Sequence, residues 1–60
     1  MNKKLIIYLN KARKPLVFKV SEENYIKILD LIDEAKLEEI ITIENISFVK
    51  REFCYAEYRW

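Results

Sequence analysis

The sequence predicts an α+β domain of order ββαββ, in which a four-stranded, mainly antiparallel sheet carries one helix on one face. Two observations predict it: short stretches of β-forming residues lie at both ends of the chain, and a stretch with helical periodicity lies between them. A chain of 60 residues buries only about 60% of its unfolded surface and cannot support two cores. We therefore expect residues 1–60 to form a single domain.

The first two strands are expected at residues 4–9 and 16–20, joined by a polar turn that contains the only proline. In the second strand Leu16, Phe18 and Val20 share one face. The first strand is apolar on both faces, which favours a central position in the sheet.

A helix is expected over residues 22–36. Apolar side chains recur there at helical spacing, at Tyr25, Ile28, Leu29, Ile32 and Ala35. Ser21 is typical of an N-cap, and Glu22 and Glu23 suit the positive end of the helix dipole.

The last two strands are expected at residues 38–43 and 46–58, with Glu44-Asn45 as the turn between them. Because the chain has no glycine, Asn45 is the expected position of a positive φ angle. The charged run at residues 50–52 predicts either a bulge or the point where this strand leaves its sheet.

A sheet with a single covering helix leaves its second face open. Ile6, Tyr8 and Val17 would lie on that face and form an apolar patch larger than monomers usually expose. A domain this small usually needs a disulfide, a metal or another subunit for stability, and a single cysteine without histidine supplies neither of the first two. We therefore expect a homodimer.

Aromatic residues are crowded at the end of the chain, where Tyr55, Tyr58 and Trp60 extend past the length of the other strands. Little of the chain remains to cover them there. These three side chains are the predicted contacts with a second subunit or a protein partner, because buried aromatic residues supply much of the affinity of interfaces.

The composition argues against an enzyme and against a bound cofactor or metal. Histidine, the commonest acid–base residue, is absent, and without glycine the chain cannot form a phosphate-binding loop. Cys54 has no imidazole to activate it, so we interpret it as a small buried strand residue. No apolar run is long enough for a membrane span or a signal peptide, so a cytoplasmic location is expected.

Charge is distributed unevenly along the chain. Residues 1–20 carry six cationic side chains and no anionic one, whereas residues 21–45 carry eight anionic and two cationic ones. Lys11, Arg13 and Lys14, at the tip of the first hairpin, could contact nucleic-acid phosphates or form the charged rim of a protein interface. The acidic helix would repel a nucleic acid, so a protein partner is expected, with a small nucleic-acid-binding regulator as the alternative.

Three segments, KLIIYLN, PLVFKVSEENY and ITIENISFVKREFCYAEY, resemble short proteins encoded by phages and mobile elements of Gram-positive bacteria with AT-rich genomes. Some of those proteins are homodimeric, non-enzymatic inhibitors of bacterial anti-phage defence. The resemblance implies a stoichiometric inhibitor that binds a host defence protein in the host cytoplasm. It carries over no functional residue.

Overall fold

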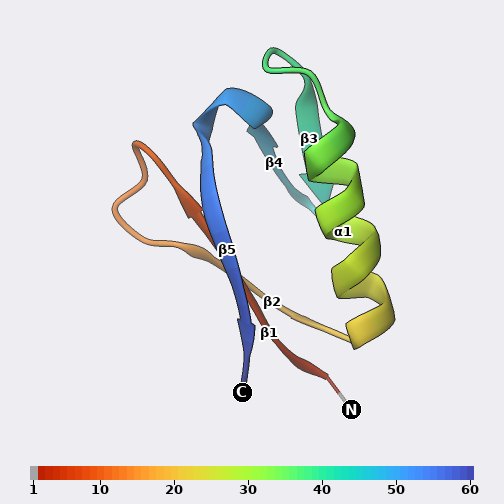
Figure 1. Ribbon diagram of the computed structural model, residues 1–60. Helices are drawn as coiled ribbons and strands as arrows, with labels where there is room; N and C mark the ends of the chain where they lie inside the picture. Colours follow the sequence, from red (N-terminus) through yellow and green to blue (C-terminus); the bar gives the residue numbers. More distant parts are fainter. Residues whose placement is uncertain (1) are drawn as a thin grey trace.

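The computed structural model describes residues 2–60 and contains one α-helix and five strands (Figure 1). The elements are β1 (Lys3–Leu9), β2 (Leu16–Val20), α1 (Glu22–Glu34), β3 (Ile40–Ile43), β4 (Ile46–Val49), the 3₁₀ turn η1 (Lys50–Glu52) and β5 (Phe53–Arg59). The α+β class is confirmed. The single four-stranded sheet is wrong, because the segment expected as one last strand forms two.

The strands form two antiparallel sheets, one of order β2-β1-β5 and one made of β3 and β4. The central position expected for the first strand is confirmed, since β1 pairs with β2 on one side and with β5 on the other. In Figure 1 the three-stranded sheet crosses the left and centre of the view, and α1 stands at the right with β3 beside it.

The core lies between these layers. Its buried members come from both sheets and from α1, namely Leu5, Ile7, Phe18, Val20, Ile32, Ile41, Ile43 and Phe48. Complete burial of such a side chain contributes about 1.5–3 kcal/mol. One face of the three-stranded sheet is therefore covered by the core.

Both ends of α1 are capped by side chains. The Ser21 hydroxyl accepts a hydrogen bond from the Asn24 amide at 3.2 Å, which confirms the predicted N-cap. The helix ends at Glu34, two residues earlier than expected, because Ala35 has an extended backbone. The last turn holds no basic residue, and the ammonium of Lys50 donates instead to the carbonyls of Ile32 and Ala35.

The turn between β3 and β4 holds the positive φ at Glu44, at 56°, so the prediction of Asn45 was wrong. Ile43 pairs with Ile46, which leaves a two-residue loop. A positive φ at the first loop position is the pattern of a type II′ turn, a common connection in tight hairpins. The strand register places Glu44 at the first loop position. This placement outweighs the greater tendency of asparagine to adopt a positive φ angle.

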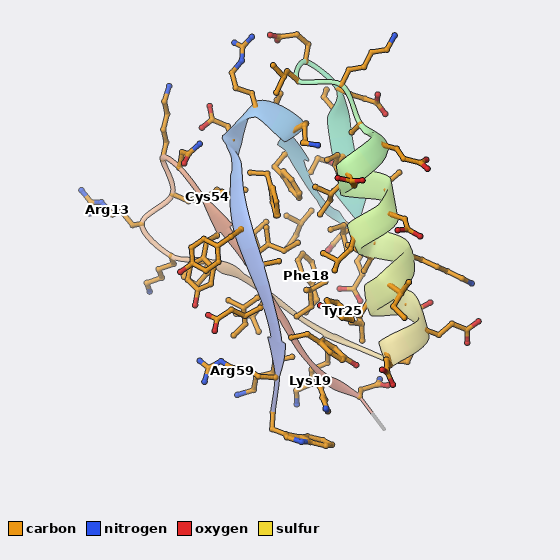
Figure 2. All side chains as sticks on the ribbon, in the orientation of Figure 1. Arg13, Phe18, Lys19, Tyr25, Cys54 and Arg59 are labelled. Carbon is orange, nitrogen blue, oxygen red and sulfur yellow. The ribbon has the colours of Figure 1, made fainter. Side chains whose placement is uncertain are left out.

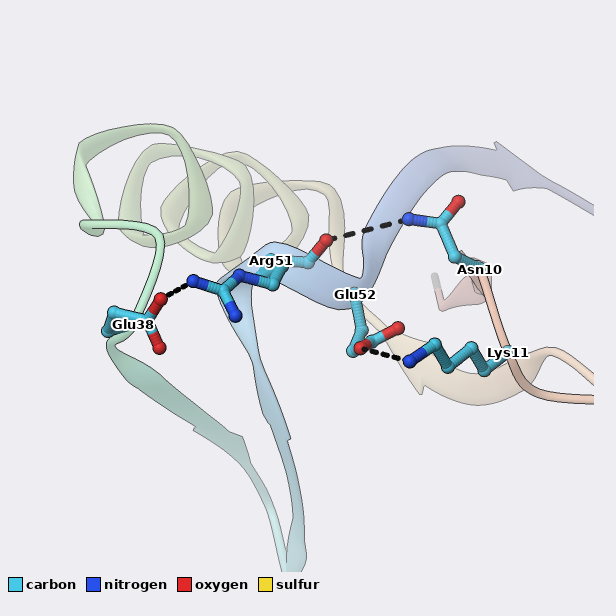
Figure 3. Close-up of polar contacts among 5 residues, drawn as sticks. All are labelled: Asn10, Lys11, Glu38, Arg51 and Glu52. Atoms are coloured by element: carbon cyan, nitrogen blue, oxygen red, sulfur yellow. Dashed lines mark hydrogen bonds and ion pairs between the residues drawn. The ribbon is translucent and has the colours of Figure 1, made fainter.

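The charged run at residues 50–52 separates β4 from β5, which confirms the second of its two predicted outcomes (Figure 3). Arg51 forms an ion pair with Glu38, and Glu52 lies 4.0 Å from the ammonium of Lys11. The Asn10 backbone amide also donates to the Glu52 carbonyl at 2.8 Å. Arg51 and Glu52 thus contact two different parts of the chain. In a continuous strand their side chains would instead point to the two faces of one sheet.

Candidate functional site

The face of the three-stranded sheet turned away from the core, called the outer face below, is open. In Figure 2, Phe18 and Tyr25 lie between this sheet and α1, whereas Arg59 projects from the opposite side of β5. Strand alternation and register assign eight side chains to the outer face: Lys4, Ile6, Tyr8, Val17, Lys19, Tyr55, Glu57 and Arg59.

One row across the outer face is entirely cationic. Lys4 pairs with Lys19 on one side and with Arg59 on the other, so three positive charges stand directly opposite one another. All three residues are exposed. Among residues 2–60 the ion pairs involve Lys11, Lys27 and Arg51 and no member of this cation row. Like charges directly opposite destabilise a sheet, so the cation row favours an anionic ligand over a role in folding.

The next row holds Val17, Ile6 and Glu57. Ile6 is only 5% exposed although no second layer of this chain was expected over it. The stems of long side chains in adjacent rows can cover apolar surface of this kind. Val17 remains 53% exposed. The apolar patch expected from the sequence is therefore smaller than its residue list suggested, and the need for a dimer to cover it is weaker.

Tyr8 and Tyr55 form an aromatic pair in the third row across the outer face. The rings of Tyr8 and Tyr55 stack with centroids 4.4 Å apart and planes inclined by 15°. The Tyr8 hydroxyl donates to Glu57 Oε1 at 2.7 Å. This hydrogen bond, helped by desolvation and by the negative charge of Glu57, raises the pKa of Tyr8 above its ordinary value of 10.0.

A bulge at Cys54 follows this pair. The β1–β5 ladder is regular from Lys4–Arg59 to Tyr8–Tyr55, but Leu9 is paired with Phe53, so Cys54 is the extra residue on β5. Without the bulge the regular ladder would place Cys54 opposite Leu9 and turn Phe53 to the outer face. The bulge therefore keeps Phe53 packed against the core. Cys54 itself is exposed, so the prediction of a buried strand residue was wrong.

Tyr58 and Trp60, predicted as partner contacts together with Tyr55, lie on the opposite face of β5 from it. Tyr58 is half-buried against the core, its ring stacks on Tyr25 with centroids 4.1 Å apart, and its hydroxyl donates to the Val20 carbonyl at 2.8 Å. The expectation that Tyr58 extends past the covered part of the chain is wrong, because β5 pairs with β1 from Lys4 to Leu9 and places Tyr58 opposite Leu5. Trp60 is 66% exposed, and the Lys3 ammonium lies 5.0 Å from its ring centroid.

The predicted hairpin-tip cations all lie in the turn between β1 and β2, and all are exposed. Lys11 is engaged by Glu52, whereas Arg13 projects far from the helix, as Figure 2 shows. The tip adjoins the tyrosine end of the outer face, and the cation row lies at the other end. Sequence reasoning missed the cation row because Arg59 meets Lys4 only through the long-range pairing of β1 with β5.

Other features of the described residues are less specific. A concave site of about 560 Å³ lies between the start of α1 and the ends of β2 and β3. Most of its lining residues are polar, and the charged ones are Lys19, Lys27 and Glu44. Within residues 2–60, Cys, Asp and Glu side chains form no group of three or more that could hold a metal ion. In the same range no helix has the length and apolarity needed to cross a membrane.

No protein-family model, curated protein or solved structure matches this chain. The outer face, with its cation row at one end and its tyrosine pair toward the other, is the feature on which a functional conclusion can be based.

Proposed function

We propose that the protein is a small, non-enzymatic nucleic-acid-binding module that uses the outer face of its three-stranded sheet. The observation that carries this proposal is the cation row of Lys4, Lys19 and Arg59, exposed and without an ion-pair partner among residues 2–60. Phosphate groups would relieve the repulsion among these charges. Aromatic rings on the same surface are typical of proteins that bind nucleic acids through both backbone and bases.

The positions of the charged side chains in the fold favour a nucleic-acid ligand more than their order along the sequence does. The anionic residues of α1 lie on the side of the molecule away from the outer face (Figure 2). The Debye length is about 8 Å at physiological salt, so salt screens the repulsion between a bound phosphate backbone and those acidic side chains of α1 that lie farther than this from the outer face.

Binding to a labelled oligonucleotide is expected to weaken steeply with salt. Three phosphate contacts give a slope of about −2 in a plot of log affinity against log salt concentration for a single strand, and contacts at the hairpin tip make it steeper. Fluorescence anisotropy at salt concentrations from about 50 to 200 mM measures the slope. The helix-side variant Lys27→Gln is the matched control, because Lys27 is bound to Glu23 on α1 at 3.7 Å, and its slope should equal that of the wild type.

Absence of binding at the lowest salt, or binding with no salt dependence, would contradict the proposal. A basic surface that gains no affinity from phosphate neutralisation is not a nucleic-acid interface.

A second candidate function is stoichiometric binding of a protein, with the host anti-phage defence protein implied by the resemblance as the partner. The observation that favours it is the exposure of Leu37 and Ile40, at 62% and 66%, beside the start of β3. The homodimer expected from the sequence stays a prediction, which light scattering at micromolar concentration checks. Co-purification of tagged protein from a defence-carrying host separates the two functions: a stable protein partner that survives nuclease treatment supports this one.

A further inference from the structure

The tyrosine pair of the outer face is fixed in place before any ligand arrives. Tyr8 is held at its hydroxyl by Glu57 and at its ring by Tyr55. Tyr55 is in turn placed opposite Tyr8 by the regular register of β5 with β1. A pair held in this way loses little side-chain entropy when a further ring is added to it.

One side of this pair is open. The strand order β2-β1-β5 makes β5 an edge strand, so no further strand of this sheet lies beyond Tyr55. One face of the Tyr55 ring is against Tyr8, and the residue is nevertheless 49% exposed. The second face of the ring is therefore available to a planar group approaching over the edge of the sheet.

We propose that this open ring face binds an unpaired base, so that the ligand of the outer face is a single-stranded nucleic acid. The inference rests on the proposed function and specifies its ligand. In a duplex both faces of each base are occupied by its neighbours, and stacking on Tyr55 would require a base to be extruded at a cost of a few kcal/mol. A single strand offers base faces without that cost, and stacking on an aromatic side chain tolerates any sequence.

The spacing of the site determines how the strand lies. Arg59 follows Tyr55 by four residues on β5, which is about 13 Å at the rise of a β-strand. The phosphates that reach the cation row therefore belong to neighbours of the stacked nucleotide. At the other end, Arg13 and Lys14 can meet the continuing backbone. Binding should accordingly need several linked nucleotides, and a mononucleotide should bind far more weakly.

The test compares the affinity of Tyr55→Leu and wild-type protein for a short oligonucleotide, alone and annealed to its complement, at one salt concentration. We expect Tyr55→Leu to lower single-strand affinity about tenfold or more and to leave duplex affinity unchanged, because stacking on one aromatic ring is lost. Tyr55→Trp should retain single-strand affinity. Ile26→Ala, a matched loss of exposed apolar surface on α1, should change neither affinity.

An oligomer of the sugar–phosphate backbone without bases separates stacking from phosphate binding. Wild-type protein and Tyr55→Leu should bind this abasic oligomer equally. If Tyr55→Leu binds the single strand as well as wild type does, or loses affinity equally for single strand, duplex and abasic oligomer, the stacking inference is overturned while the nucleic-acid proposal stands. If wild-type protein binds none of the three ligands, both fail.

Discussion

Replacing the cation row with neutral residues, in the triple variant Lys4→Gln, Lys19→Gln, Arg59→Gln, is expected to lower single-strand affinity about 100-fold at 0.1 M salt. Each lost phosphate contact removes about 0.7 from the salt slope, so three contacts remove about 2. The same variant should be as stable as the wild type or more so, because repulsion between directly opposed cations disappears. Anisotropy measures the affinity and thermal melting the stability.

Two further variants change the charge on the two sides of the molecule, one on the outer face and one on the helix side. Glu57→Gln removes the one anionic side chain of the outer face, keeps an oxygen to accept from Tyr8, and should raise the affinity. Lys27→Gln together with Lys36→Gln removes cations on the helix side and should leave it unchanged. A row variant that melts lower than the wild type and binds equally well would mean that these residues serve folding and not binding.

Tyr58→Ala is expected to destabilise the fold by about 2–4 kcal/mol. The change removes a half-buried aromatic side chain, its stacking on Tyr25 and its hydrogen bond to the Val20 carbonyl. Total stability for 60 residues is about 3–9 kcal/mol, so this change removes a substantial fraction of it. Urea denaturation followed by circular dichroism measures the change in the free energy of unfolding.

The matched series separates the contributions of Tyr58. Tyr58→Phe keeps the ring and should cost about 1 kcal/mol for the lost hydrogen bond. Trp60→Ala removes a side chain that is 66% exposed and should change stability by less than about 0.5 kcal/mol. Equal stability of Tyr58→Ala and wild type would show that Tyr58 is not part of the core and would restore its predicted role as a partner contact.

Local features of the fold could be predicted because they depend on short stretches of sequence. The Ser21 cap, the strand at residues 16–20 and the central position of β1 follow from neighbouring residues alone. The break at residues 50–52 was also predicted as one of two outcomes, since three successive charges cannot alternate between a core and solvent. Its consequence, a second sheet, was not predicted, because no local signal says which strand the released segment joins.

The candidate site depends on pairings across the whole length of the chain. Lys4 and Arg59 are far apart in sequence, and only the β1–β5 register makes them neighbours. The same register makes Tyr55 meet Tyr8, and a single bulged residue, Cys54, decides that Phe53 lies opposite Leu9. A one-residue shift of that kind is not visible in hydrophobic periodicity. Tyr58 was assigned to a partner because β5 was expected to extend beyond the sheet.

The central claim, that the outer face binds nucleic acid, is tested most directly by methyl NMR spectra recorded while a short single-stranded oligonucleotide is added. Ile6 and Val17 carry methyl groups on the outer face, whereas Ile26, exposed on α1, and Ile40, exposed on β3, lie elsewhere. We predict saturable shifts at Ile6 and Val17 and none at Ile26 and Ile40. Shifts confined to Ile26 or Ile40, or no shift at Ile6 and Val17 at saturating oligonucleotide, would contradict the claim.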